Sequence, residues 1–380
     1  MKAVSFAICL LAGPLAAQAT PAPVASSTPT APPAFAFSGV LFGNFQYRGD
    51  EPGRAANRFD VERAYLTFQT PVRDRLGVRV TTDLFQQTNP GSDNFYRGWV
   101  IRAKYAYLQY NFPGQADSRG WARAGLLQTV FIEHDEKTWP RWISTSPTER
   151  AGYFSSADAG VSASASLPGK AGELYATVTN GPGYTSREVD RFKDYAARLT
   201  LTPWARDTTS GLRGFAFTVW GYRGATASRF ADGGTGQTGA IGSGLARDRF
   251  GAHVSAVSPN FTAAAQYARR VEEIESGTNT TVSPRSVRDS TGTLASAYLV
   301  VRPFAGSRAK SPPPLSVIGR FDRVVASRET DATYNVVIGG LIWDLSKNVS
   351  ISLDYQETTP VRMNPVAPVK TYFAHLVARY

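Results

Sequence analysis

Cysteine is nearly absent from this sequence. Its 380 residues include a single cysteine, Cys9, which lies within the first apolar stretch. A disulfide bond or a cysteine-ligated metal site needs at least two thiols. We therefore expect neither in the body of the chain, and backbone pairing and side-chain packing must supply its stability.

Long apolar runs are also missing beyond the first 19 residues. A transmembrane helix needs about 20 consecutive apolar residues, and no later segment approaches this length. The sequence therefore excludes a bundle of membrane-spanning helices.

The first 19 residues predict a secretory signal peptide. Lys2 supplies the positive start, residues 4–11 form the apolar stretch, and residues 17–19, Ala-Gln-Ala, form a small-x-small cleavage site. A membrane anchor is the alternative, but Gly13 and Pro14 interrupt the apolar stretch. Cleavage after residue 19 would remove the only thiol of the chain.

Residues 20–34 are almost entirely Pro, Ala, Ser and Thr. Such a segment cannot form a packed core, and we expect a flexible linker. No second break in composition follows. Residues 35–380 are therefore expected to form one domain.

That domain consists of short segments with alternating apolar and polar residues, separated by clusters of Gly, Pro, Asn, Asp and Ser. Period-2 alternation predicts β-strands, and no segment has a convincing helical period. The alternation predicts sixteen strands, at residues 36–48, 58–70, 77–87, 98–112, 121–131, 153–166, 173–181, 191–203, 214–225, 248–258, 260–271, 292–303, 314–325, 332–345, 348–357 and 368–380.

The connections between these strands alternate between long and short. Long ones include "GDEPGRAAN", "QTNPGSDNFY", an insert near 226–247 and the segment "VEEIESGTNTTVSPRSVRDS", whereas "PVRDRLG", "PGKAG" and "SKN" are short. Outer-membrane barrels have short periplasmic turns and long outward loops. We therefore predict an all-β fold, a transmembrane antiparallel up-and-down β-barrel, in the outer membrane of a Gram-negative-type cell. A soluble β-sandwich is the alternative.

The last predicted strand offers a partner for the first. An unpaired edge strand invites aggregation, and pairing of residues 368–380 with residues 36–48 would close the barrel. The C-terminal residue, Tyr380, would then lie in the aromatic girdle at the periplasmic interface, where amphipathic rings are favoured.

The polar faces of many strands carry charge. A charged side chain that faces lipid at mid-depth costs about 2–4 kcal/mol, so these groups must face inward. A dry interior could not hold them, and sixteen strands are wide enough for an aqueous channel. A slip of phase before Leu108 indicates a β-bulge there. The predicted pore-lining residues are Arg63, Arg79, Arg102, Lys104, Arg123, Arg198 and Arg320.

This inward set is richer in arginine than in carboxylate, and the whole chain has a net charge of +11. Fixed guanidinium groups raise the local concentration of anions and suit phosphate and carboxylate geometry. The alternative is that each arginine pairs with a wall carboxylate, such as Asp83, Asp194 or Asp322. We expect a net preference for anions. For an exported chain we expect no nucleic-acid partner, only membrane lipid and small anionic or polar solutes.

The third long connection, roughly residues 132–153, is a candidate constriction loop. It follows the fifth strand, where general porins fold a loop into the lumen. The alternative is a solvated external loop. Its candidate site residues are Glu133, Asp135, Lys137, Arg141 and Arg150.

Several segments together resemble the phosphate-selective porin O and P family. They are "FDVERAYLTFQTPVRDRLGVRVTTDL", the degenerate second copy "YAYLQYNF", the link "ARAGLLQTVFIEH" and the terminal "HLVARY". The resemblance implies a sixteen-stranded passive channel with anion preference, usually a homotrimer, in which Arg63, Tyr65 and Asp83 belong to the first motif. The chain departs from the family in having few, scattered lysines where the family has a lysine cluster.

The sequence gives little support for an enzyme or for a metal site. The histidines are His134, His253 and His375, and "EHDE" at 133–136 lacks the helical i, i+4 histidine pair of a zinc site. No serine lies in a nucleophile-elbow sequence, although a hydrolase built from His253 and a wall serine is conceivable. We expect no enzyme activity, no metal and no cofactor. A barrel with a closed lumen that acts as a structural or adhesion protein is the alternative function.

Overall fold

The computed structural model describes residues 35–49, 57–87, 98–113, 120–188, 190–228, 244–277, 286–305, 313–361 and 367–380. They belong to one compact unit, Ala34–Tyr380. The predicted signal peptide and linker lie outside the described residues. No helix among the residues described here has the length and hydrophobicity to cross a membrane.

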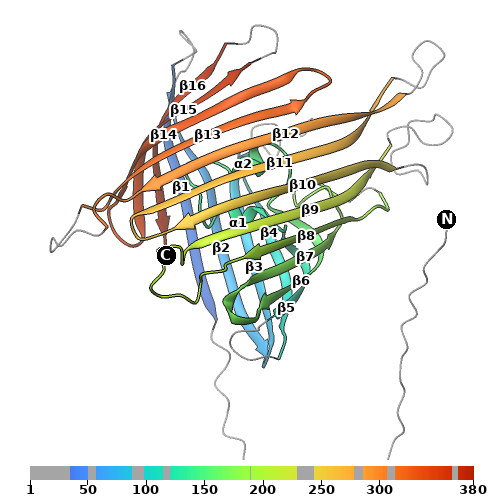
Figure 1. Cartoon of the computed structure of the whole chain (residues 1–380), viewed down its shortest axis with the longest axis horizontal. Helices are drawn as coiled ribbons and strands as arrows, with labels where there is room; N and C mark the ends of the chain where they lie inside the picture. Colours follow the sequence, from blue (N-terminus) through green and yellow to red (C-terminus); the bar gives the residue numbers. More distant parts are fainter. Residues whose placement is uncertain are drawn as a thin grey trace, which may run out of the picture. The chain divides into compact units, whose positions relative to one another are not determined.

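Sixteen strands form one closed antiparallel barrel in which each strand pairs with its neighbours in the sequence (Figure 1). The strands are β1 (Ala36–Arg48), β2 (Asn57–Arg73), β3 (Leu76–Gln87), β4 (Gly98–Asn111), β5 (Gly120–Gln128), β6 (Ala157–Leu167), β7 (Gly172–Thr179), β8 (Asp194–Leu201), β9 (Phe215–Ala227), β10 (Gly244–Val257), β11 (Phe261–Ser276), β12 (Ser286–Val301), β13 (Leu315–Ser327), β14 (Ala332–Asp344), β15 (Val349–Pro360) and β16 (Val369–Arg379). The predicted up-and-down barrel of sixteen strands is confirmed.

The barrel closes where β1 meets β16. Their register runs from Val40 opposite Arg379 to Arg48 opposite Thr371. Beyond β16, Gly39 and Tyr380 exchange both backbone hydrogen bonds, with N–O distances of 2.9 and 3.1 Å. The Tyr380 ring packs 5.8 Å from the Phe37 ring and is 60% exposed. Strand β16 is therefore paired on both sides, with β1 and with β15.

Alternation along the strands separates an inner face from an outer one. In β13, Arg320 and Asp322 are buried, whereas Val317 and Phe321 are 44% and 48% exposed. Apolar side chains turned outward suit contact with lipid, and polar ones turned inward avoid its cost. The bulge expected before Leu108 is present, because the β3–β4 register shifts at Thr81/Thr82.

Several predicted boundaries differ from the observed ones. The fifth predicted strand, 121–131, ends at Gln128, and the sixth, 153–166, starts only at Ala157, because the chain between them turns into the barrel. The segment at 271–290 was expected to be a long connection, but β11 continues to Ser276 and β12 begins at Ser286. Polar residues such as Glu272 and Ser290 stay paired across this hairpin, which composition alone does not indicate.

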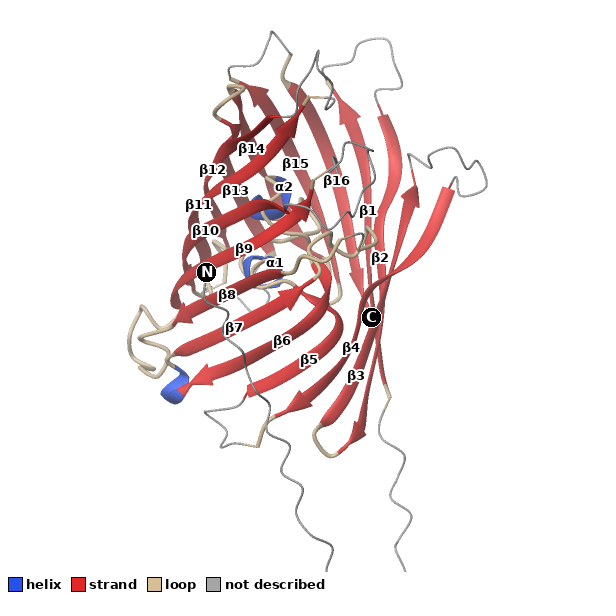
Figure 2. Cartoon of the chain, turned by 90° about the vertical axis from the view of Figure 1, so that its right-hand side faces the viewer, coloured by secondary structure: helices blue, strands red, loops and turns tan. Residues whose placement is uncertain are grey.

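Two short helices, α1 (Ile132–Asp135) and α2 (Pro147–Arg150), lie inside the barrel (Figure 2). Both belong to the connection 129–156 between β5 and β6, which we call the interior loop. A short 3₁₀ helix, η2 (Pro168–Lys170), lies in the β6–β7 turn. The helices are minor elements, as the lack of a helical period in the sequence indicates.

Candidate functional site: the interior loop and the charged wall

The interior loop is held by apolar packing at two places. Trp139, Trp142 and Ile143 pack in one cluster with inward residues of β12–β14, such as Ile338. Phe131 packs in a second cluster with residues that include Trp220 and Leu294. The large apolar side chains of the connection therefore point at the wall, and the connection is an interior loop and not the solvated external loop of the alternative.

Asp135 anchors α1 to the opposite wall. Its carboxylate accepts hydrogen bonds from the Tyr298 hydroxyl at 2.6 Å and the Gln266 amide at 3.1 Å, and the residue is 0% exposed. Burial raises the pKa of the Asp135 carboxyl to about 6, partly offset by these two hydrogen bonds. The predicted constriction residue therefore lies in the contact between loop and wall, away from water.

Further wall side chains bind carbonyl oxygens of the loop backbone. Arg320 donates to the carbonyl of Thr145 at 2.7 Å, and the Gln356 amide donates to that of Ile143 at 2.9 Å. A short segment inside a barrel cannot satisfy all its own backbone acceptors. These polar wall residues do so and fix the position of the loop.

His134 and His253 lie side by side inside the barrel. The His134 and His253 rings are 5.6 Å apart, and His134 Nε2 lies 3.0 Å from the Thr218 hydroxyl. Burial, followed by the charge of Arg198, lowers the pKa of His134 to about 2, so the ring is neutral. Among the described residues, no serine hydroxyl bonds to the His253 ring, and no group of three metal-ligating side chains occurs.

Four of the seven predicted wall cations have carboxylate partners. Arg63 and Arg102 both reach Asp83, at 2.8 and 2.9 Å, and that carboxylate is 0% exposed. Arg320 pairs with Asp322 at 2.6 Å. The fourth cation, Arg198, pairs with Glu173, which the sequence reading did not select. The Arg320 and Arg198 pairs are formally neutral, as the alternative interpretation of the wall arginines predicts. Arg63 and Arg102 share one carboxylate, so the group at Asp83 keeps a net charge of +1.

The other three wall cations have neutral partners. Arg79 donates to the Thr81 hydroxyl at 3.1 Å, and Lys104 donates to the Tyr65 hydroxyl at 2.9 Å. The third, Arg123, donates to the amide oxygens of Gln109 and Gln128, each at 2.8 Å. Within the described part of the chain none of them has a carboxylate in ion-pair distance. We call Arg79, Lys104 and Arg123 the cation row.

Aromatic rings support the cation row without cancelling its charge. Arg79 lies 5.0 Å from the Tyr105 ring centre, and Lys104 lies 4.1 Å from that of Tyr65. Arg123 lies 3.7 Å from the Trp121 ring. Ring faces attract cations through their quadrupole. The row runs over β3, β4 and β5, and the bulge in β4 turns Lys104 inward.

The remaining predicted loop residues differ in their surroundings. Arg141 pairs with Glu136 at 2.8 Å and with Glu149. Glu133 and Lys137 are exposed towards the interior space. Burial, followed by the charge of Arg320, lowers the pKa of the Arg150 guanidinium. The loop therefore presents both signs of charge.

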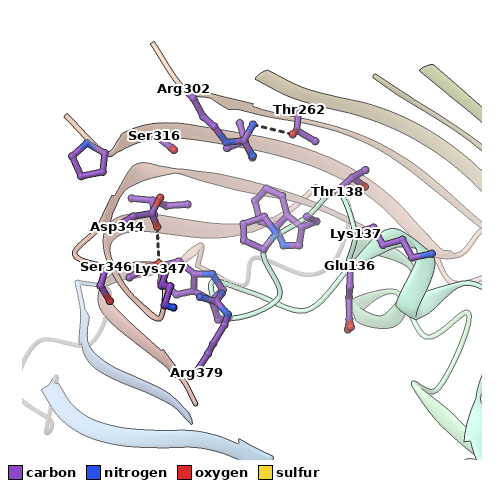
Figure 3. Close-up of a pocket in the computed structure, with 17 residues that line it drawn as sticks. Glu136, Lys137, Thr138, Thr262, Arg302, Ser316, Asp344, Ser346, Lys347 and Arg379 are labelled. Atoms are coloured by element: carbon purple, nitrogen blue, oxygen red, sulfur yellow. Dashed lines mark hydrogen bonds between the residues drawn. The ribbon is translucent and has the colours of Figure 1, made fainter. Parts of the chain in front are cut away.

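Three cavities lie between the interior loop and the short-turn end of the barrel. One, of about 370 Å³, adjoins the cation row and is lined by Arg79, Lys104, Arg141, Arg379, Glu133 and Glu136 among others. A second, of about 560 Å³, shares Glu136, Trp142 and Arg379 with the first. Figure 3 shows this second cavity, with Glu136 and Lys137 on the loop side and Arg302, Lys347 and Arg379 on the wall side.

Each cavity has more cations than carboxylates. The first has four cations and two carboxylates, and the second has Lys137, Arg302, Lys347 and Arg379 against Glu136 and Asp344. The third, of about 460 Å³, has Lys137, Lys170 and Arg198 against Glu173. Each cavity therefore has a formal charge of +2, with His134 neutral.

Sequence reasoning missed Tyr298, Gln266 and Glu173 as site residues, and also the cations Arg302, Lys347 and Arg379. All except Lys347 lie on or next to strands with inward polar positions, so a systematic reading of strand faces could have found them. Nothing in the sequence pairs Asp135 with Tyr298, which is 163 residues away.

Comparison with known proteins gives the fold. No family model matches the chain, and no curated protein matches it. The anion-selective porin from Comamonas acidovorans is similar in structure, with a TM-score of 0.58 and 9% identity over 92% of this chain and 100% of that one.

Two further outer-membrane structures match in the same way. OmpF of Salmonella typhi, solved with daunomycin, has a TM-score of 0.58 and 11% identity, over 91% of this chain and 97% of that chain. The trimer form of OmpT of Vibrio cholerae has a TM-score of 0.54 and 11% identity, over 92% and 100%. These similarities show the fold, a closed antiparallel barrel of sixteen strands like those of outer-membrane proteins. The resemblance to the phosphate-selective O and P family stays a prediction.

Proposed function

We propose that this protein is a passive outer-membrane channel for small hydrophilic solutes and that it prefers anions, phosphate and carboxylates among them. The observation that carries the proposal is the cation row, three inward cations that neutral partners hold in place. The porin-type barrel and the structural similarity to an anion-selective porin support it. The proposal includes no enzyme activity and no cofactor.

The positions of the charges favour anions over cations. The arginines paired with Asp322 and Glu173 contribute little net field. The two arginines at Asp83 keep one net positive charge, and Arg79, Lys104 and Arg123 keep theirs. The three cavities below the loop continue this positive potential towards the short-turn end. A charged, narrow passage with low-dielectric walls concentrates counter-ions and excludes co-ions.

Reversal potential in a potassium chloride gradient tests the proposal. We expect the wild-type channel to be anion-selective. The variant Arg79→Gln/Lys104→Gln/Arg123→Gln should lower the chloride-to-potassium permeability ratio at least threefold, because it removes three unpaired charges. Cation selectivity of the wild type, or an unchanged ratio in the variant, would contradict the proposal.

A matched control removes a wall cation without changing net charge. The variant Glu173→Gln/Arg198→Gln deletes one ion pair between β7 and β8, away from the cation row on β3–β5. It should leave the permeability ratio within measurement error of the wild type. A fall equal to that of the cation-row variant would indicate distortion of the loop and not loss of field.

A closed barrel with a structural or adhesive role is the second candidate function. The dense packing of the interior loop against the wall favours it, since Trp139 and Phe131 are both 0% exposed. Planar-bilayer recording separates the two functions. Conductance steps support the channel, and a folded protein that gives no steps supports the closed barrel.

We further propose that the protein assembles as a homotrimer, as the trimer form of V. cholerae OmpT does. Chemical cross-linking of detergent-purified protein should give a trimer band. A monomer alone at all protein concentrations would count against this assembly.

A further inference from the structure

Three arginines lie on the outer face of the barrel. Arg223, Arg269 and Arg323 are exposed; Arg323 lies between two buried residues along its strand, and Arg269 follows the buried Ala268. Each lies eight positions after the first residue of its strand, in β9, β11 and β13. We call these three residues the arginine belt.

The strand register fixes how the belt is spaced. The row of paired residues through Arg223 reaches β11 at Val271, two residues beyond Arg269. The row through Arg269 reaches β13 at Val325, again two residues beyond Arg323. From one arginine of the belt to the next, the path therefore crosses two strands and shifts by two residues along the strand. Strand geometry makes the separation about 12 Å.

The belt lies near the long-loop end. Eight residues on a strand tilted by roughly 40° place each arginine about 20 Å from the strand's start at the short-turn end. The apolar band of such barrels is about 25 Å tall, so the guanidinium groups lie at its outward boundary. The large exposed side chains of Phe250, Tyr267 and Phe321 lie beside or below them.

These arginines are nearly without protein partners. Arg269 and Arg323 have no ion pair among the described residues, and Arg223 reaches only the exposed Asp248, at 3.9 Å. A guanidinium on a lipid-facing surface is unfavourable unless it meets polar or anionic groups. Arginine also binds phosphate through two parallel hydrogen bonds.

We propose that the arginine belt binds the phosphate groups of a phosphorylated glycolipid in the outward-facing leaflet. The regular spacing suits a rigid disaccharide headgroup that has a phosphate at each end, so that adjacent arginines engage one lipid molecule. A phospholipid with a single phosphate can meet only one arginine at a time. The outward orientation of the belt makes this binding independent of solute passage.

Lipid binding to the purified full-length protein tests the inference. The probes are a bisphosphorylated disaccharide lipid, its monophosphorylated form and phosphatidylglycerol, each titrated in detergent and followed by native mass spectrometry. We expect Arg223→Gln/Arg269→Gln/Arg323→Gln to bind the bisphosphorylated lipid at least tenfold more weakly than the wild type. The wild type should prefer that lipid over the monophosphorylated form by a similar factor.

The control variant, Arg73→Gln/Arg75→Gln/Arg213→Gln, removes three exposed arginines at the short-turn end. It should change binding less than twofold. Equal losses in both variants, or equal binding of all three lipids by the wild type, would overturn the inference. If the triple belt variant does not fold, the single variant Arg269→Gln should still weaken binding severalfold. Unchanged channel conductance in the belt variants confirms that the barrel is intact.

Discussion

Asp135 and His134 are adjacent in the sequence and respond to acid in opposite ways. The carboxyl has a pKa raised to about 6, from an ordinary value of 3.8, by burial. The imidazole has a pKa lowered to about 2, from 6.5, also by burial. Burial therefore favours the neutral form of each group when the interior loop is docked, so Asp135 stays protonated up to about pH 6 and His134 stays neutral down to about pH 2.

As pH rises, the two pKa shifts change the free energy of loop docking in opposite directions. An acid whose pKa is raised stabilises the docked state fully below pH 4 and loses this contribution as pH rises towards 6. A base whose pKa is lowered stabilises the docked state above pH 6.5 and loses this contribution as pH falls. Between pH 4 and pH 6 the two residues largely compensate.

Single variants should expose each contribution. In His134→Gln, docking of residues 131–139 should weaken as pH rises from 4 to 6, by up to roughly 3 kcal/mol. In Asp135→Asn, docking should strengthen from pH 4 to 6.5. Amide hydrogen exchange of this segment, corrected for intrinsic rates, measures both. Parallel pH profiles of the two variants would contradict the assignment.

At the scale of single elements, β5 depends on a glycine. Gly125 has φ +126° in the middle of the strand, and a Cβ there would lie 2.3 Å from the Ala106 carbonyl oxygen of β4. Because the strand is irregular at Gly125, the consecutive residues Leu127 and Gln128 are both buried, each 0% exposed. Gln128 then accepts the hydrogen bond of Arg123.

We expect Gly125→Ala to destabilise the barrel by about 1–3 kcal/mol, because the backbone conformation and the close contact both oppose a side chain. Gly339→Ala is the matched control, since a Cβ at Gly339 meets no atom within 4 Å. Urea unfolding followed by tryptophan fluorescence measures both variants. Equal stability of the two would show that β5 relaxes around the methyl group.

At the scale of the whole molecule, the fold depends on one seam between the ends of the chain. Gln46 and Phe373 face each other across β1 and β16. The variant Gln46→Cys/Phe373→Cys, with Cys9 replaced by serine, should form a disulfide in the folded protein. Opposite residues in antiparallel strands bring Cβ atoms within reach of such a bond.

The control for the β1–β16 pairing is a cysteine pair that is out of register. Gln46→Cys/Thr371→Cys shifts one partner by two residues, because Thr371 pairs with Arg48. Electrophoresis of denatured, non-reduced samples should show a faster-migrating cross-linked chain for the first pair only. Cross-linking of the second pair in preference to the first would mean a different register.

The sequence by itself determined the strand number, the faces of the strands and the pairing of first with last. These features depend on local signals, such as the alternation in "VSISLDYQ" and the turn residues of "SKN", and each strand pairs with its neighbours in the sequence. Only the tertiary structure decided which arginines keep their charge and where the interior loop lies. Arg198 pairs with Glu173 on the neighbouring strand because of the β7–β8 register. Asp135 meets Tyr298 across the interior because the barrel closes around the loop.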